Sequence, residues 1–327
     1  MTGHFLQIEN LARRFPQPGS KEPTTVFEGV NFSIEKGEFV CIIGHSGCGK
    51  STILNVLAGL DYPSDGHVIM DGKVIEGPSR DQGVIFQNHS LLPWLSTLHN
   101  VTFAVRARWP SWSRAKIREH SVRYLEMVGL GEVLSRKPAQ LSGGMRQRVG
   151  IARAFAGNPR VVIADEPVSA LDVSVQAAVS QLLMDIQREN RTTLVFISHD
   201  LSLVRYLADR VVVMYLGTIA EQGTTDEVFA PPYHPYTEAL LSAVPIADTR
   251  IKKKEIVLQG DIPSAVNPPP GCPFQTRCPR KIGTICETEA PPIREFGPGH
   301  RIACHIEPAE LEAMEPVITM PAKEAAA

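Results

Sequence analysis

The fold of this chain is decided by one glycine-rich stretch, Gly44-His45-Ser46-Gly47-Cys48-Gly49-Lys50-Ser51-Thr52. An apolar run, Phe39–Ile43, precedes the stretch, and a helix-like run over 53–58 follows it. Strand, glycine-rich loop and helix in this order, ending in a lysine and a serine, are typical of a phosphate-binding P-loop. An ordinary glycine turn is the alternative, and eight fitting positions in this context disfavour it.

Each residue type in this loop has a chemical role. Glycines let backbone N–H groups turn inward around phosphate oxygens, and the helix N-terminus adds its positive dipole end. Lys50 can reach the β- and γ-phosphates of a nucleotide, and Ser51 can ligate Mg²⁺. The predicted nucleotide-binding residues of the loop are Gly44, Ser46, Gly47, Gly49, Lys50, Ser51 and Thr52.

Length and composition restrict the kind of protein. A chain of 327 residues can hold one large domain and a smaller one. Its hydrophobic content of 43% is ordinary for a globular protein, and its net charge of −2 gives no argument for a nucleic-acid partner. The sequence shows neither a signal peptide nor an apolar run near the ~20 residues that span a bilayer. We therefore expect a cytoplasmic protein, or one that reaches a membrane through a partner.

Two more apolar runs end in residues suited to nucleotide chemistry. Asp165 and Glu166 directly follow the run 161–164, and His199 follows the run 193–197 by one serine. Parallel strands present such residues at one edge of a sheet. Asp165 suits Mg²⁺, Glu166 suits polarising the attacking water, and His199 suits sensing the γ-phosphate better than a structural role.

Three other features point to the same ligand. Gln87 follows a short predicted strand over 83–86, where a polar side chain would enter the ligand crevice. Leu141-Ser142-Gly143-Gly144 opens a helix that runs to about Ala156, and its N-terminus suits phosphate. Helical patterning covers 98–156 with a polar break at 108–113. Phe15 could stack on an adenine ring, although a buried core position is an alternative.

Together these motifs resemble the ATP-binding cassette (ABC) ATPases of membrane transporters, over about residues 5–245. The P-loop, Gln87, the signature at 141–144, the strand at 161–165, the loop at 169–172 and His199 stand in the order of that family. The resemblance implies an α/β P-loop NTPase cassette with a RecA-like core, a β-subdomain and a helical subdomain at about 88–156. We assign this cassette to residues 1–245.

The resemblance also implies a mechanism and partners. Two cassettes would close head-to-tail around two ATP molecules, so that Ser142, Gly143 and Gly144 of one protomer meet the γ-phosphate held by the other. Glu166 and His199 would support hydrolysis, and Asp172 would contact the nucleotide. Mg²⁺ would be held by Ser51, Gln87 and Asp165. The partners would be a second, identical or paralogous ATPase, two membrane permeases and, indirectly, an extracytoplasmic solute-binding protein, with this chain on the cytoplasmic face.

The segment after Gln87 is the part of such a cassette expected to contact the permeases. It carries an apolar cluster, Leu91-Leu92-Pro93-Trp94. The alternative is that Trp94 packs inside the helical subdomain.

The two halves of the chain favour different transporters. Segments 41–50 and 86–94 look like nitrate, sulfonate and taurine importer ATPases. Segments 164–176 and 231–241 look like oligopeptide and dipeptide importer ATPases, and so do 267–274, 277–279 and 299–301 in the extension. We favour peptides as the transported substrate, and the nitrate or sulfonate type stays open.

Other functions of the same nucleotide-binding head fit less well. DNA-repair ATPases often carry a long insertion between P-loop and signature, and here that span is about 90 residues without heptads. Translation-factor ATPases normally hold two cassettes, and no second P-loop is found. A regulatory subunit would usually lack Lys50, Glu166 or His199, and all three are present.

Residues 246–327 form a proline- and cysteine-rich extension. Half of the 26 prolines lie between Pro231 and Pro298, which favours extended, turn-rich structure over long helices or central strands. Such a segment buries little apolar surface, so it needs an additional cross-link, here called a staple, to hold it together. From about Glu307 the acidic, alanine-rich end is expected to fray.

Four cysteines lie in this extension: Cys272, Cys278, Cys286 and Cys304. Their spacing lacks the Cys-x-x-Cys pairs usual for structural zinc, while four thiolates match the ligand count of a 4Fe–4S cluster. The resemblance adds weight, since some peptide-importer ATPases carry such a cluster. Zinc, with His300 and His305 as spare ligands, is the second interpretation, and four unligated thiols are the third. In a cytosolic chain a disulfide framework is not expected.

Overall fold

The computed structural model describes residues 4–17, 19, 23–169, 171–245 and 252–319. The chain forms two compact units, which are built from 1–9, 32–40 and 51–198, and from 10–31, 41–50 and 199–327. The chain passes between them within four elements: β1 (Leu6–Phe15), β2 (Thr24–Ile34), β3 (Phe39–Gly44) and α1 (Lys50–Leu57).

The first unit contains three parallel strands that carry the predicted acidic residues. Strand β7 (Val161–Asp165) pairs with β6 (Gln82–Ile85) on one side and β8 (Thr193–Ile197) on the other. The side chains of β8 are all buried, as are those of β7 before Asp165. Strands covered on both faces read as continuous apolar runs, which is why the sequence located them. The hairpin from β4 (Asp65–Met70) to β5 (Lys73–Val74) turns at Asp71-Gly72, a pair of residues typical of tight turns.

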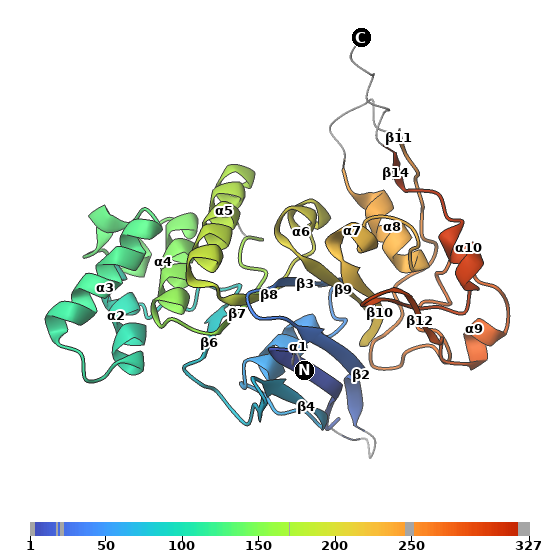
Figure 1. Cartoon of the computed structure of the whole chain (residues 1–327), viewed down its shortest axis with the longest axis horizontal. Helices are drawn as coiled ribbons and strands as arrows, with labels where there is room; N and C mark the ends of the chain where they lie inside the picture. Colours follow the sequence, from blue (N-terminus) through green and yellow to red (C-terminus); the bar gives the residue numbers. More distant parts are fainter. Residues whose placement is uncertain (1–3, 18, 20–22, 170, 246–251, 320–327) are drawn as a thin grey trace, which may run out of the picture. The chain divides into compact units, whose positions relative to one another are not determined.

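The predicted helical subdomain is also in the first unit. Helices α2 (Thr97–Arg108), α3 (Arg114–Met127) and α4 (Gly143–Ala156) contact one another, and α5 (Val173–Asn190) contacts α4 (Figure 1, green to yellow-green). Short 3₁₀ turns, η1 (Gly131–Val133) and η2 (Pro138–Gln140), lie before α4. The polar break between α2 and α3 is confirmed.

The second unit contains an antiparallel sheet. Strand β10 (Thr218–Thr224) lies between β9 (Arg210–Tyr215) and β13 (His300–Ala303), and β13 also pairs with β12 (Ile293–Gly297). A separate short pair joins β11 (Lys252–Lys253) to β14 (Ile318–Thr319). The helices of this unit are α6 (Leu201–Leu207), α7 (Thr225–Val228), α8 (Pro235–Ala243), α9 (Ile285–Thr288) and α10 (Pro308–Glu312).

The extension is more regular than the sequence analysis predicted. The expectation that it lacks a central strand is wrong, because β13 has neighbours on both sides. The run 299–306 contains no proline, so β13 keeps the N–H groups that both edges need. The expectation of fraying from Glu307 is wrong up to residue 319, since Leu311 and Val317 are buried. Residues 320–327 and the domain boundary at 245/246 involve residues outside the described part.

A buried contact between a histidine and a glutamate ties β13 to β10. His300 Nε2 lies 3.0 Å from Glu221 Oε1, and both side chains are at most 3% exposed. The second oxygen of Glu221 accepts the backbone N–H of His234 at 2.8 Å. Burial raises the pKa of Glu221, and the hydrogen bond from His300 opposes that rise. A buried carboxylate needs such partners, so the pair fixes this strand in the sheet.

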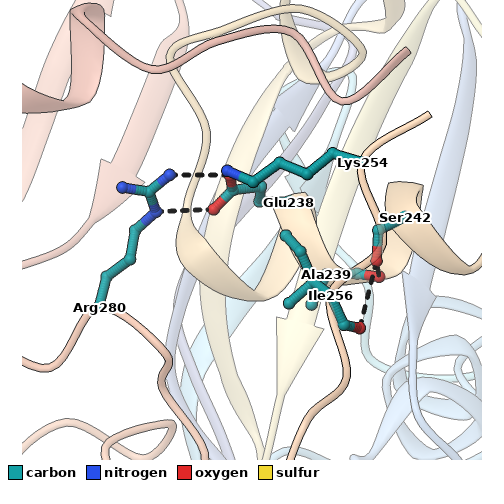
Figure 2. Close-up of polar contacts among 6 residues, drawn as sticks. All are labelled: Glu238, Ala239, Ser242, Lys254, Ile256 and Arg280. Carbon is teal, nitrogen blue, oxygen red and sulfur yellow. Dashed lines mark hydrogen bonds and ion pairs between the residues drawn. The ribbon is translucent and has the colours of Figure 1, made fainter. Parts of the chain in front are cut away.

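A second buried glutamate anchors the segments that follow α8. The carboxylate of Glu238 accepts two hydrogen bonds from Arg280, at 2.8 and 2.9 Å, and one from Lys254 at 3.0 Å (Figure 2). Ser242 adds a hydrogen bond to the carbonyl of Ile256 at 3.4 Å. Burial alone would raise the pKa of Glu238, but the bonds from Arg280 and Lys254 lower it. The staple that a proline-rich extension needs is therefore supplied here by ion pairs.

Glu238→Gln should lower the free energy of unfolding by about 1–2 kcal/mol at pH 7, because the charge-assisted bonds weaken while the exposed ends of Arg280 and Lys254 regain water. The folded-state pKa of Glu238 lies below its ordinary value of 4.5, so its stabilisation is present above that pH and is lost as the pH falls through the folded value. Urea unfolding of parent and variant should differ at pH 7 and converge in acid.

The matched control is Glu287→Gln, which breaks the more exposed pair with Lys281. That change should cost well under 1 kcal/mol at any pH. An equal loss in both variants, or a loss at Glu238 that persists in acid, would show that the buried carboxylate does not anchor the extension.

Within the described residues, no helix combines the length and the apolar character that crossing a bilayer requires. All six cysteines are free thiols.

Candidate nucleotide-binding site

The P-loop connects β3 to α1 as the sequence predicts, and its glycines are sterically required. A Cβ atom on Gly44 would lie 2.3 Å from the carbonyl oxygen of Met214, which is closer than atoms can approach. Gly49 has a φ of +100°, a conformation that L-residues with side chains avoid. The loop is also joined to its unit through the N–H of Gly217, which donates to the carbonyl of Cys48 at 3.2 Å.

Lys50 is buried within the loop. Its Nζ donates to the carbonyl oxygens of Gly44 and His45, both at 2.8 Å, and lies 3.9 Å from Cys48 Sγ. Because its side chain is only 7% exposed, these contacts hold the ammonium in one place. A fixed cation beside backbone N–H groups is suited to binding phosphate.

Phe15 ends β1 and is 38% exposed, so the alternative of a buried core position is wrong. The guanidinium of Arg13 lies over its ring, 4.2 Å from the centroid. An exposed aromatic face of this kind can stack on a planar base.

The structure brings Gln87 and Glu166 together. Gln87 Nε2 donates to Glu166 Oε2 at 3.2 Å. Glu166 has a φ of +41°, rare for a residue other than glycine, and its N–H donates to the carbonyl of Ile197 at 3.2 Å. Strained backbone of this kind is concentrated at functional sites. Asp165 precedes it at the end of β7 and is half-buried.

The signature residues occupy the start of α4. Ser142 is the N-cap, and its Oγ accepts the N–H of Met145 at 3.3 Å. A Cβ atom on Gly144 would lie 2.7 Å from Val175 Cγ1, so this glycine allows α4 and α5 to approach closely. A Cβ atom on Gly143 would meet nothing within 4 Å. Packing inside the chain therefore does not explain Gly143, while approach of a ligand from outside would.

Two residues that the sequence analysis missed join the segment after Gln87 to α4. His89 Nε2 lies 3.1 Å from the carbonyl of Gly143, and Arg153 donates to the carbonyl of Ser90 at 2.7 Å. Neither residue has a local sequence signal, because both bonds are made to backbone atoms more than 50 residues away. Through these hydrogen bonds, helix α4, which begins at the signature residues, is attached directly to the segment 88–90.

The remaining predicted residues lie at element ends. His199 is exposed between β8 and α6, and the next residue, Asp200, caps α6 by accepting two backbone N–H groups. Asp172 is the N-cap residue of α5. Ser51 and Thr52 lie in the first turn of α1. Ala170, within the predicted loop 169–172, lies outside the described residues.

The apolar segment after Gln87 is accessible. Trp94 is 67% exposed, so its alternative role inside the helical subdomain is wrong. Leu92 lines a groove of about 300 Å³ together with Phe103, which is 60% exposed. The rest of the groove comes from β6, α2 and α4, with Arg80, Arg108 and Arg153 among its lining residues.

The four cysteines of the extension are neighbours without forming a metal site. Burial and the neighbouring thiols raise the pKa of Cys272 to about 11 and that of Cys278 to about 12. The N–H of Cys272 also donates to the carbonyl of Cys286 at 2.8 Å. Yet in the part of the chain that the structure describes, no three Cys, His, Asp or Glu side chains are arranged to hold a metal ion.

The two histidines considered as spare zinc ligands have other partners. His300 pairs with Glu221, and His305 Nε2 lies 2.9 Å from the carbonyl of Glu289. Both are buried, so neither is poised to ligate zinc beside Cys304.

Comparison with known proteins identifies the families that this chain resembles. Residues 27–169 match the ABC transporter family, and residues 220–286 match the oligopeptide/dipeptide transporter C-terminal region. A probable peptide ABC transporter ATP-binding protein of Sinorhizobium fredii, y4tS, is 42% identical over 94% of this chain and 91% of its own length. The oligopeptide transport ATP-binding protein OppF of Escherichia coli is 43% identical over 92% of each chain.

A solved structure agrees. The dimeric, post-hydrolysis ATP-binding cassette MJ0796, bound to ADP and phosphate, has a TM-score of 0.62 and 33% identity over 67% of this chain and 98% of its own.

A P-loop, a Gln87–Glu166 pair and a serine-glycine helix start on this α/β fold define an ATP-binding cassette ATPase. The chain belongs to the ABC transporter family, among the ATP-binding proteins that carry the oligopeptide/dipeptide transporter C-terminal region. ATP and Mg²⁺ are the ligands of this family in general.

Proposed function

We propose that this chain hydrolyses ATP to drive the uptake of oligopeptides or dipeptides through partner membrane permeases. The observation that carries the proposal is the extension, whose strand β13 is built into the sheet of the second unit beside β10. Similar chains with this C-terminal region are named as peptide transport proteins. The nitrate, sulfonate or taurine alternative is supported only by segments 41–50 and 86–94.

Each residue of the nucleotide site then has a role. Lys50 and the P-loop N–H groups hold the phosphates, Phe15 stacks on the adenine, and Ser51 and Asp165 hold Mg²⁺. Glu166 orients and polarises the attacking water, with Gln87 fixing its carboxylate through the 3.2 Å hydrogen bond. His199 contacts the γ-phosphate.

The signature residues act on a second cassette. Gly143 borders open space, and Ser142 can still donate its hydroxyl hydrogen while its oxygen caps α4. Both features suit a phosphate presented by a partner ATPase, identical or paralogous. Asp172 lies at the start of the neighbouring helix α5 and would face the same ligand.

Two permeases would place the chain at the cytoplasmic face of the membrane, with a solute-binding protein acting from the other side. Trp94 and Phe103 are exposed aromatic side chains, and Phe103 lines a groove with Leu92; apolar side chains of this kind suit contact with a permease segment. Because His89 and Arg153 connect this region to the signature helix, binding there could reach the nucleotide.

Trp94→Asp should abolish peptide uptake by cells that depend on this chain, while the purified variant keeps the ATP hydrolysis rate of the parent within about twofold. A carboxylate in place of the exposed indole ring removes apolar area that docking would bury, and it adds a desolvation cost. Labelled dipeptide uptake and phosphate release are the two measurements.

Glu132→Gln, on the η1 turn and outside the lining of the groove, is the control and should change neither measurement. Loss of ATP binding by Trp94→Asp would contradict a docking role for Trp94. Retained peptide uptake would contradict it as well.

We further propose that Cys272, Cys278, Cys286 and Cys304 hold a structural 4Fe–4S cluster, with zinc as the second candidate. Support comes from four free thiols, three of which, Cys272, Cys278 and Cys304, have a pKa raised by burial and, to a smaller extent, by neighbouring thiols. Their present arrangement is not a ready metal site, so binding would require the segments that carry them to close and to release the thiol protons.

Anaerobic purification followed by iron, sulfide and zinc analysis tests this proposal. About four iron and four sulfide per chain, lost in Cys278→Ser, is the expected result. Cys41→Ser is the control, because that buried cysteine lies in β3 and should leave the metal content unchanged. One zinc without acid-labile sulfide, or no metal at all, would eliminate the cluster.

A further inference from the structure

The second unit contains a cavity of about 590 Å³ that the nucleotide chemistry does not use. Its walls come from β2, β10, β13, the turn at Leu216-Gly217 and the proline-rich segment 265–273. The P-loop residues 44–50 are not among its lining residues. A cavity of this size is within the range that binds small organic ligands.

Most of the wall is apolar and rigid. Pro268, Pro269, Pro270 and Pro291 contribute to it. Proline has no N–H and a fixed φ, so such a wall demands no hydrogen-bond acceptors and resists collapse into the space it borders. The cavity therefore suits an apolar body.

One buried polar group on the wall lacks a partner. Gln222 lines the cavity, its side chain is only 5% exposed, and its Oε1 accepts no hydrogen bond in the part of the chain that the structure describes. Leaving a buried amide oxygen unsatisfied is costly, and rotation of the amide can exchange its oxygen and nitrogen. That oxygen has almost no accessible surface, so Gln222 contributes to the wall without presenting its oxygen to a ligand.

Two opposite charges also line the cavity. Arg301 uses its Nε to bond Glu295 at 3.0 Å, and within the described residues its two terminal nitrogens donate no hydrogen bond. Glu28 lies on the wall with its side chain 62% exposed, and its ion pair with Arg14 is long, at 3.8 Å. A guanidinium fork matches a carboxylate, and a carboxylate matches an ammonium group.

We propose that this cavity binds a short apolar peptide as its zwitterion. Arg301 holds the terminal carboxylate and Glu28 the terminal ammonium, while the proline wall covers the apolar side chains. The inference rests on the proposed function only for the source of the peptide, which would be the product of import.

The cavity is connected to the P-loop through its own wall. Gly217, a lining residue, donates to the carbonyl of Cys48, and Glu28 donates its N–H to the carbonyl of Gly217, both at 3.2 Å. Val26 also lines the cavity, and a Cβ atom on Gly49 would lie 3.3 Å from its Cγ1. A bound peptide would therefore change the affinity for ATP, and ATP would change the affinity for peptide by the same factor.

Calorimetric titration of the purified full chain with Leu-Leu, its C-terminal amide and free leucine tests the proposal. Leu-Leu should bind with one-to-one stoichiometry, and both the amide and free leucine should bind at least tenfold more weakly. Arg301→Gln should weaken Leu-Leu at least tenfold and leave the amide unchanged, because the amide lacks the charge that Arg301 recognises.

Ala303→Trp fills the cavity from β13 and should abolish binding. Ala309→Trp, at an exposed position of α10 outside the cavity, is the matched control and should bind Leu-Leu as the parent does. Thermal unfolding checks that each variant folds.

Absence of saturable Leu-Leu binding by the parent, or undiminished binding by folded Ala303→Trp, would overturn the proposal. Tighter binding of leucine than of Leu-Leu would overturn the assignment to a peptide. Since the titration needs no permease, failure here would leave peptide import untouched, and failure of import would leave the binding result untouched.

Discussion

Glu166→Gln should slow ATP hydrolysis by about 10²-fold or more while leaving ATP affinity within a few-fold of the parent. The amide keeps the size of the carboxylate, and its oxygen can still accept the 3.2 Å hydrogen bond from Gln87. It cannot polarise water as an anion does. Phosphate release and equilibrium binding of a fluorescent ATP analogue, measured on the same preparation, separate the two effects.

The matched control is Glu189→Gln, which removes an exposed glutamate paired with Arg123. Hydrolysis by that variant should equal that of the parent. Near-parent hydrolysis by Glu166→Gln would show that this carboxylate, despite its left-handed backbone and its contact with Gln87, is not the group that activates water.

Lys50→Ala should reduce ATP affinity by about 10²-fold and bring hydrolysis to background. A buried ammonium that bonds two phosphates contributes charge-assisted hydrogen bonds of about 1.5–3 kcal/mol each, and 1.4 kcal/mol corresponds to a factor of ten. The carbonyls of Gly44 and His45 hold its ammonium group in place, so no other side chain of the loop can replace it.

Truncation of Lys50 also leaves those two carbonyls without their donor, which could distort the loop. Lys50→Arg separates the two effects, because it keeps the charge and should retain more affinity than alanine. Lys73→Ala, on the exposed strand β5, controls for loss of a positive charge alone. Parent-like ATP affinity of Lys50→Ala would contradict the role of this lysine.

These roles were predictable because their sequence signals are local. The P-loop requires a glycine at position 44, because a Cβ atom there would lie 2.3 Å from the carbonyl oxygen of Met214. Glycines of this kind are visible in the sequence. The acidic pair after β7 is likewise marked by the buried apolar run before it. Strand and helix positions around the site follow from the same local patterns.

The arrangement of the extension was not predictable in this way. Strand β13 is fixed by pairing with β10 and by the hydrogen bond between His300 and Glu221, which lie 79 positions apart. In the sequence, Glu221 looks like a polar residue near a hairpin, and His300 looks like a spare metal ligand. Only the fold shows that these two side chains are hydrogen-bonded to each other. The same is true of Glu238 and Arg280.

The extension is therefore part of the second unit's sheet. The contacts of Glu221 with His300 and of Glu238 with Arg280 attach it to that unit, and the proposed cluster would add to them. This is a physical reason to expect that loss of Cys278 changes metal content more than it changes folding.

Uptake by membrane vesicles that contain the purified permeases, this chain and its partner ATPase tests the central claim most directly. Labelled dipeptide, presented with the solute-binding protein, should accumulate only with ATP and Mg²⁺, and Glu166→Gln should stop it; nitrate and taurine should neither accumulate nor compete. ATP-dependent accumulation of nitrate or taurine without accumulation of peptide would contradict the account.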